Sequence, residues 1–392
     1  MMIAAYVSEN KELLVELRRY FHAHPEVSLK EYHTCEKIEE ELDRYGIEHR
    51  RIGDTGVYAW LQGGQGEGPV MVLRADIDAL AMDDLKQEAP YCSQNQGVCH
   101  ACGHDAHTAT LLVAAKILKE KQAEFKGEVR FFFQQAEEIG QGARQFVKAG
   151  LLDGAKRVFG VHVASSIPSG YISLTPGPNN ASCDYFKITV KGKGAHVSTP
   201  QLGVDALYVA SQIVVNLQSV VSRMTDPIDT VILGIGKMEA GTQYNIVANQ
   251  AVLEGTTRSF SKETRERVNG LVVSMSKDIA SLYGAQCEVL FEDYAAPLIN
   301  DADACQEAYQ VCARFLDEDH IITNREKALS ADDFADYLEK VKGVYAYLGT
   351  YNADLPHTGV AHHNGYFDID EDTLQISCQL YVDYALSVLN ED

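Results

Sequence analysis

Residues 129–163 read VRFFFQQAEEIGQGARQFVKAGLLDGAKRVFGVHV and indicate how the chain folds. The run Val129–Phe133 is rich in β-forming residues, and Val158–Val163 is a second apolar run of strand length. Between them, Gln141–Lys148 predicts a helix that ends at Gly150. A strand, a helix and another strand in succession are typical of a βαβ unit in a parallel sheet.

The same alternation extends on both sides of this unit. Strands are expected at Val70–Leu73 and Gly343–Leu348. Helices are expected at Ser8–Phe21, Thr34–Tyr45, Thr108–Lys121, Cys305–Phe315, Asp332–Lys340 and Thr373–Leu389. We therefore predict an α/β domain whose mainly parallel sheet is covered by helices on both faces.

A different order of elements interrupts this domain. The expected elements are Tyr185–Val190, a helix from Val204 to about Val221, Asp229–Leu233, Ala251–Thr257, Lys262–Tyr283 and Cys287–Phe291. The resulting β-α-β-β-α-β order is that of a small ferredoxin-like α+β unit with helices on one sheet face. We predict a catalytic domain of residues 1–179 and 298–392, interrupted by an inserted domain of residues 180–297.

Composition excludes several classes of partner. The 392 residues include 34 Lys and Arg against 56 Asp and Glu, a net charge of −22, without a basic stripe for nucleic acid. No apolar run approaches the ~18 residues that would span a membrane. The nine scattered cysteines, and an N-terminal stretch without the features of a secretory signal, predict free thiols in the cytoplasm.

Potential metal ligands gather in one part of the sequence. His100, Cys102, His104, Asp105 and His107 lie within eight residues, and the expected strands carry further candidates at or past their carboxyl ends, namely Asp76, Asp78, Glu137, Glu138 and His162. Such ends share one crevice in a parallel sheet, so these side chains should converge. A thiolate, imidazoles and carboxylates suit a divalent metal such as zinc, and a second carboxylate can serve as a base for water. The sequence therefore predicts a metallohydrolase.

Three motifs resemble one known family. His100-Ala-Cys-Gly-His-Asp-Ala-His-Thr108, Arg74-Ala-Asp-Ile-Asp-Ala-Leu80 and Gln134-Gln-Ala-Glu-Glu138 are similar to the signatures of the dinuclear-metal amidohydrolases. These include hippurate hydrolase, the auxin-conjugate hydrolases and N-acetyl-diaminopimelate deacetylase, relatives of the aminoacylase and carboxypeptidase G type of zinc peptidase. The similarity runs from Arg18–Glu26 to His363–Asp370.

The resemblance implies roles for particular residues. It implies two divalent metal ions, Zn²⁺ or Mn²⁺, whose ligands would be Cys102, His104, Glu138, His162 and His363. Glu137 would be the general base, and Asp78 would orient one of the ligands. His363 keeps the spacing of the closing family motif to Phe367, whereas His362 would need one inserted residue and is the second choice. Sequence alone does not decide which of the two glutamates binds metal; the resemblance does. The implied reaction is hydrolysis of the amide bond of N-acyl amino acids.

The inserted domain resembles a lid and dimerisation domain. Its His196 matches a histidine that in relatives reaches the active site of a partner subunit, while Asn245 and Arg258 match positions that contact the substrate. The resemblance thus implies a homodimer that acts on a small molecule. The guanidinium of Arg258 can bind a carboxylate through two hydrogen bonds, which would favour substrates that end in a free amino acid.

Other interpretations remain open at this stage. A dipeptidase or carboxypeptidase could use the same site, a relative could bind acyl amino acids without turnover, and Cys99–Cys102 could form a redox pair. Positions that depart from the family pattern, and leave the substrate open, are Ala81, Cys99, Gln135, Gln201, Asp332 and Gly365. His22 and His24 are interpreted as packing residues near a helix end.

Overall fold

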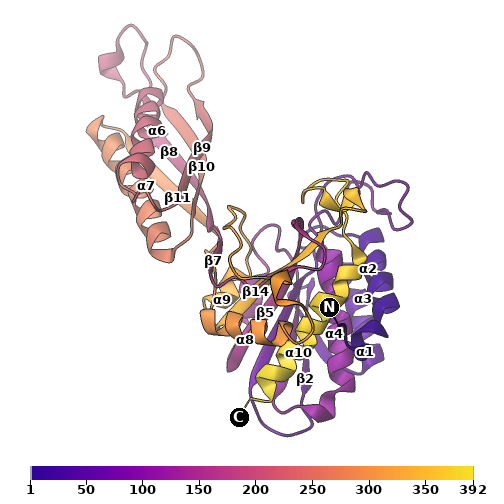
Figure 1. Cartoon of the computed structure of the whole chain (residues 1–392). Helices are drawn as coiled ribbons and strands as arrows, with labels where there is room; N and C mark the ends of the chain where they lie inside the picture. Colours follow the sequence, from indigo (N-terminus) through magenta and orange to yellow (C-terminus); the bar gives the residue numbers. More distant parts are fainter. Residues whose placement is uncertain (1, 392) are drawn as a thin grey trace. The chain divides into compact units, whose positions relative to one another are not determined.

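The computed structural model describes residues 2–391 and divides the chain into two compact units (Figure 1). Among the described residues, the larger unit comprises 2–177, 300–326 and 332–391, and the smaller one 178–299 and 327–331. The divisions lie close to the expected joins at residues 180 and 297. Residues 327–331 differ from expectation, because they group with the smaller unit through bonds such as Ala181 N–H to the carbonyl oxygen of Ala328 (3.1 Å).

The larger unit is built on an eight-stranded sheet of order β1-β2-β4-β3-β5-β14-β6-β13. Its strands are β1 (Glu48–Ile52), β2 (Gly56–Gln62), β3 (Val70–Asp76), β4 (Glu128–Gln134), β5 (Ala155–Pro168), β6 (Ile172–Ser173), β13 (Ile321–Ile322) and β14 (Gly343–Tyr351). The central strands β4, β3, β5 and β14 are mutually parallel, whereas β1, β2 and β6 add antiparallel pairs. The mainly parallel sheet expected from the sequence is confirmed.

Helices cover both faces of this sheet. They are α1 (Ala5–Ser8), α2 (Lys11–Ala23), α3 (Tyr32–Tyr45), α4 (His104–Glu120), α5 (Ala143–Lys148), α8 (Ala302–Cys312), α9 (Ala335–Leu338) and α10 (Leu374–Leu389). Strand β4 shows the two layers, because Phe131 and Phe133 join the core that contains α2, α4 and α10. Between them, Phe132 points to the other face and packs on Phe146 of α5 and Tyr337 of α9.

The predicted helix Asp332–Lys340 is wrong in its extent, because only Ala335–Leu338 is α-helical. The carboxylates of Asp332 and Asp333 instead accept bonds from the backbone N–H of Phe334 (2.8 Å) and of Ala143 (3.0 Å). These side-chain bonds compete with regular helix formation, so the first turn does not form.

The smaller unit has the predicted β-α-β-β-α-β order. It contains β8 (Cys183–Lys191), α6 (Ala206–Ser222), β9 (Val231–Ala240), β10 (Gln250–Ser259), α7 (Lys262–Leu282) and β11 (Gln286–Ala295), while β7 (Gly177–Asn180) and β12 (Leu298–Asn300) pair where the chain enters and leaves it. The antiparallel sheet has the order β11-β8-β10-β9. Phe186, Ile188 and Val190 alternate along β8 toward a core that includes α6 and α7. Of the helices in residues 2–391, none is long and apolar enough to cross a membrane.

Candidate metal centre

The candidate ligands lie where neighbouring parallel strands end. Strand β3 ends at Asp76, β4 ends at Gln134 just before Glu137 and Glu138, and β5 carries His162. Because β3 is paired on one side with β4 and on the other with β5, their carboxyl ends share one crevice. Helix α4 begins at the same place, with His104 as its first residue.

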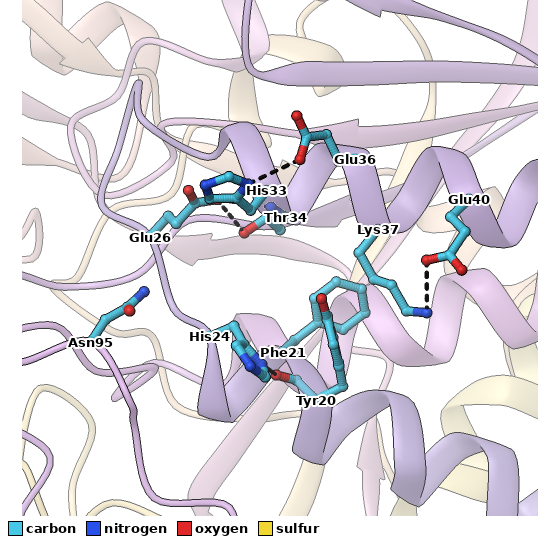
Figure 2. A pocket seen from close by; sticks show the side chains of 10 residues that line it. All are labelled: Tyr20, Phe21, His24, Glu26, His33, Thr34, Glu36, Lys37, Glu40 and Asn95. Atoms are coloured by element: carbon cyan, nitrogen blue, oxygen red, sulfur yellow. Dashed lines mark hydrogen bonds and ion pairs between the residues drawn. The ribbon is translucent and has the colours of Figure 1, made fainter.

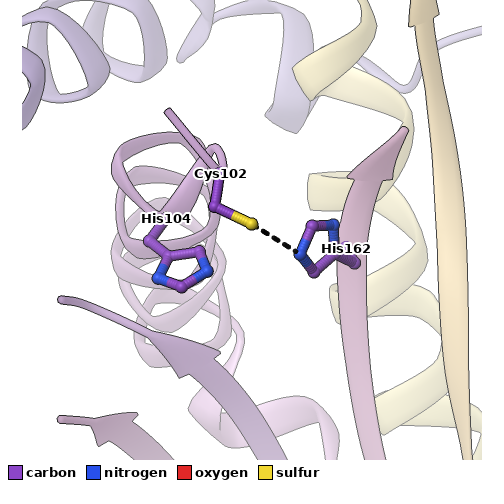
Figure 3. A group of neighbouring side chains, drawn as sticks. All are labelled: Cys102, His104 and His162. Atoms are coloured by element: carbon purple, nitrogen blue, oxygen red, sulfur yellow. Dashed lines mark hydrogen bonds between the residues drawn. The ribbon is translucent and has the colours of Figure 1, made fainter. Parts of the chain in front are cut away.

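The turn Cys102-Gly103-His104 presents two ligands side by side. Gly103 adopts φ 89°, which favours glycine, and a Cβ there would lie 2.2 Å from Cγ2 of Val163. Cys102 Sγ lies 3.5 Å from Nε2 of His162 (Figure 3). The ligand atoms of Cys102, His104 and His162 all lie within 4.8 Å of one another. This distance is suitable for three ligands of one cation.

A second group of ligands shares Cys102 with the first. Nε2 of His363 lies 3.4 Å from Oε2 of Glu138, and both lie within 4.8 Å of the Cys102 sulfur. Nε2 of His104 lies 4.0 Å from a carboxylate oxygen of Glu138 and also 4.0 Å from one of Glu137. The five predicted ligands therefore come together around Cys102, with the predicted base beside them.

Buried atoms without a partner show that this site fits a metal. Nε2 of His104 and Oε1 of Glu138 are buried and have no hydrogen-bond partner within the described structure. An unsatisfied buried ring nitrogen and carboxylate oxygen are costly, and a cation between them removes that cost. The donor set of sulfur, imidazole and carboxylate is also one that divalent transition metals prefer.

The charges around the site point to a cation as well. Burial raises the pKa of Cys102 well above its usual range, and Glu138 and Glu137 add to this effect. Burial also raises the pKa of Glu137, helped by the charges of Asp332 and Glu138. A bound divalent cation reverses this balance, because it favours the thiolate and the ionised carboxylates.

Two aspartates orient the histidines. Nδ1 of His104 lies 2.9 Å from the backbone oxygen of Asp78 and 3.2 Å from its Oδ1. Nδ1 of His107 lies 2.5 Å from Oδ1 of Asp76, and its Nε2 accepts a bond from Val163 N–H at 2.9 Å. Burial opposes protonation of His104, but Asp76 and Asp78 raise its pKa to about 10. Asp78 thus contacts the ring of His104, the residue it is expected to orient, and Asp76 makes a comparable contact with His107.

Of the two adjacent histidines, His363 faces the centre. It adopts φ 59°, unusual for a residue other than glycine, and such strain is common at functional sites. Nε2 of His362 instead accepts a 3.4 Å bond from the backbone N–H of Ser165. The geometry thus favours His363 over His362 as the ligand.

His22 belongs to a buried polar network beside α4. Its Nδ1 lies 2.7 Å from Asp105 and its Nε2 3.2 Å from Asp84, and Arg18 donates a 2.9 Å bond to the same Asp105. With Cys99, His22 and Asp84 form another group of metal-ligand type. Because the imidazole nitrogens and the Asp84 carboxylate already have partners, this group has the character of a structural network.

A separate hollow of about 330 Å³ lies between α2 and α3 (Figure 2). Its charged side chains pair with one another, as in His33 with Glu36 (2.9 Å) and Lys37 with Glu40 (3.1 Å). None of the proposed metal ligands lines it. We therefore assign it no part in catalysis.

In the smaller unit, His196 and Asn245 lie close together and Arg258 lies far from both. His196 forms a bridge with Ile246, and the backbone N–H of Val197 donates to the oxygen of Asn245 at 3.2 Å. Arg258 lies near the other end of β10, where its guanidinium donates to the oxygen of Leu329 at 3.0 Å.

Residues 72–387 match the family model described as peptidase family M20/M25/M40. The chain belongs to this family. It is 38% identical over 378 residues to N-acetylcysteine deacetylase of Bacillus subtilis (96% of this chain, 97% of that protein). It is 39% identical over 300 residues to N-acyl-L-amino acid amidohydrolase of Geobacillus stearothermophilus (76% and 80%).

A solved structure gives the same result. The YXEP protein of Bacillus subtilis, described as a dinuclear metal-binding peptidase of the M20 family, matches with a TM-score of 0.83 and 35% identity, covering 97% of this chain and 99% of that one. The family, the fold class and the prediction of an enzyme that hydrolyses amide bonds are thereby confirmed.

Proposed function

We propose that this M20 enzyme hydrolyses the amide bond of N-acyl amino acids, releasing a carboxylic acid and an amino acid. The observation that carries the proposal is the convergence of Cys102, His104, Glu138, His162 and His363, with Glu137 directly beside them. The deacetylase and amidohydrolase relatives support this substrate class.

We propose two divalent cations, Zn²⁺ or Mn²⁺, which Cys102, His104, Glu138, His162 and His363 would hold. When bound, they would polarise the amide carbonyl and lower the pKa of the attacking water. The mixed sulfur, nitrogen and oxygen donors favour zinc, and the dinuclear YXEP structure supports the number of ions.

Glu137 is the proposed general base. Its carboxylate would take a proton from the attacking water and pass it to the nitrogen of the leaving amine, a role worth about 10²–10⁴-fold in rate. Asp78 would act as a positioning residue, because it holds the ring of His104.

We propose a homodimer in which His196 acts on the partner's substrate. Gln250 and Arg258 are eight positions apart along β10, or about 26 Å at 3.3 Å per residue, and His196 lies beyond the Gln250 end. An acyl amino acid, about the size of a dipeptide, spans only about 7 Å. His196 and Arg258 of the same smaller unit therefore cannot contact one substrate molecule together.

The surface of the smaller unit supports a dimerisation role for it. Helix α6 exposes Leu207 (46%), Tyr208 (48%) and Val215 (67%), although its opposite face is buried in the core. Exposed apolar side chains gathered on one helix are typical of a protein–protein contact. The free cysteines of the described chain are consistent with the cytoplasm as the proposed location.

One experiment separates this function from its alternatives. Purified protein loaded with Zn²⁺ or Mn²⁺ is given acetyl, benzoyl and indolyl amino acids beside dipeptides, and released amine and bound metal are measured. Hydrolysis of the acyl amino acids supports the proposal, whereas hydrolysis of dipeptides alone would indicate a dipeptidase. Binding without turnover would indicate a non-catalytic relative, and a cycling Cys99–Cys102 disulfide a redox protein.

Subunit complementation tests the dimer. Inactive Glu137→Gln and inactive His196→Ala proteins are mixed under conditions of subunit exchange. In a mixed dimer one active site has both native residues, so activity should return. Absence of recovery despite proven exchange would exclude action of His196 across subunits.

A further inference from the structure

The loop of residues 135–142, between β4 and α5, carries both glutamates of the metal centre. It contains no strand or helix, and Ala136 adopts the left-handed conformation (φ 54°). The ends of the loop meet, because a Cβ on Gly142 would lie 1.7 Å from the backbone oxygen of Gln135. A strained, irregular loop that must place two carboxylates needs firm attachment to its surroundings.

Asp333 holds this loop at both ends. Its Oδ1 accepts from Nε2 of Gln134 (2.8 Å), the last residue before the loop, and its Oδ2 accepts from the backbone N–H of Ala143 (3.0 Å), the first residue after it. Nη2 of Arg74, on strand β3, also donates to Oδ1 at 3.0 Å. Asp333 is fully buried, so water does not replace these bonds.

Glu31 holds the loop near its strained residue. Its Oε1 accepts from the backbone N–H of Ala136 at 2.9 Å, and Glu31 is fully buried. This bond fixes the residue directly before Glu137. Asp78 adds a third bond of the same kind, from the backbone N–H of Glu138 to Oδ2 at 3.1 Å.

The chemistry of the partners explains why carboxylates occupy these positions. Gln134 Nε2, the Ala143 N–H and Arg74 Nη2 are all donors, so both oxygens of the side chain at position 333 must accept. An asparagine would turn an NH₂ group toward one of these donors. At position 31 the loop offers the single donor Ala136 N–H, so one carbonyl oxygen is enough.

We propose that Asp333 and Glu31 are positioning residues, the loop anchors, which hold residues 135–142 so that Glu137 and Glu138 face the metal centre. Asp333 supplies the attachment of both ends, and Glu31 the attachment at Ala136. Their effect on catalysis depends on the proposed function, whereas their effect on the loop does not.

The first test measures the loop itself. Hydrogen–deuterium exchange of metal-free full-length protein is followed in peptides covering residues 135–142, for the wild type and Asp333→Asn. We expect exchange in these peptides to be at least about tenfold faster in the variant, because the local opening free energy falls when a buried bond is lost. Asp336→Asn is the matched control: Asp336 is a nearby buried aspartate whose carboxylate accepts a 2.9 Å bond from Nε of Arg144 in α5.

A conservative pair of variants tests Glu31. Glu31→Gln keeps an oxygen acceptor for Ala136 N–H, so its loop exchange should equal that of the wild type. Glu31→Met has similar length without the acceptor, and its exchange should rise. If Asp333→Asn does not fold, Gln134→Met provides a second variant, since it removes the Nε2 donor at the same end of the loop.

Metal binding and kinetics complete the test. We expect Asp333→Asn and Glu31→Met to bind Zn²⁺ about 10–100-fold more weakly in a competition titration, and kcat to fall by a similar factor with little change in KM. Unchanged loop exchange in Asp333→Asn, or an equal rise in Asp336→Asn, would overturn the proposal. Faster loop exchange in a protein that hydrolyses no amide would support the anchors and overturn the proposed function.

Discussion

Replacement of Glu137 by Gln separates the roles of two adjacent glutamates. The amide keeps the size of the side chain but cannot accept the proton from water, so turnover should fall by about 10²–10⁴-fold, equal to about 3–5 kcal/mol in the barrier. Glu137 lies among the buried carboxylates of Asp76, Glu138, Asp332 and Asp333, whose charges repel its own. We therefore expect Glu137→Gln to keep the fold, and the metal-free variant to be at least as stable as the metal-free wild type.

The assay combines three measurements on the same samples. Bound metal per chain, the rate of amine release from an N-acetyl amino acid and the midpoint of thermal unfolding are compared for the wild type, Glu137→Gln and Glu138→Gln. The second variant is the matched control, because Glu138 faces His363 at 3.4 Å and should lose metal as well as activity. Native turnover in Glu137→Gln would refute the assigned base. Loss of metal from Glu137→Gln alone would show that the two glutamates have exchanged roles.

Three further predictions concern other parts of the larger unit. Arg18→Met should lower the free energy of unfolding by about 3–5 kcal/mol in urea denaturation, because it removes the guanidinium that neutralises the buried carboxylates of Asp105 and Asp368; a loss below about 1 kcal/mol would contradict this. Gly103→Ala should weaken zinc binding in a competition titration, because the new methyl group meets Val163 and φ 89° is strained; native affinity would show that the turn tolerates a side chain. Burial raises the pKa of Glu31 to about 7, so the Glu31 carboxyl binds its proton more tightly in the folded state than in the unfolded state. The contribution of this proton to folding stability is therefore fully present below about pH 4 and is lost as the pH rises through 7. Glu31→Gln removes this titration, so metal-free variant protein should gain about 2–3 kcal/mol relative to the wild type between pH 5 and pH 8 in urea denaturation; a difference independent of pH would contradict the sign.

The sequence could point to the candidate metal centre because the proposed ligands lie next to recognisable strands and helices. Glu137 and Glu138 come just after an apolar run, Cys102 comes just before helix α4, and His104 is the first residue of that helix. These patterns are local in the sequence. The side chains come close together in space because neighbouring parallel strands end at the same edge of the sheet.

The loop anchors could not be found in this way. Asp333 bonds a residue 190 positions away, and Glu31 one that is 105 positions away, so neither bond leaves a periodic signal in the sequence. For Asp333 the local pattern was misleading, since helix propensity extended the predicted helix over a residue whose side chain serves another element. The separation of His196 from Arg258 also required the register of the sheet in the smaller unit.

The position of β14 has a consequence for the nascent chain during synthesis. This strand pairs with β5 at the centre of the large sheet, yet it is synthesised only after the whole smaller unit. Until then the ribosome-bound polypeptide displays one side of β5 with its N–H and C=O groups unmatched, and such an open edge can recruit a strand from another molecule. The time needed to translate residues 178–342 thus sets how long the edge of β5 stays unpaired in the nascent chain and can aggregate with other molecules.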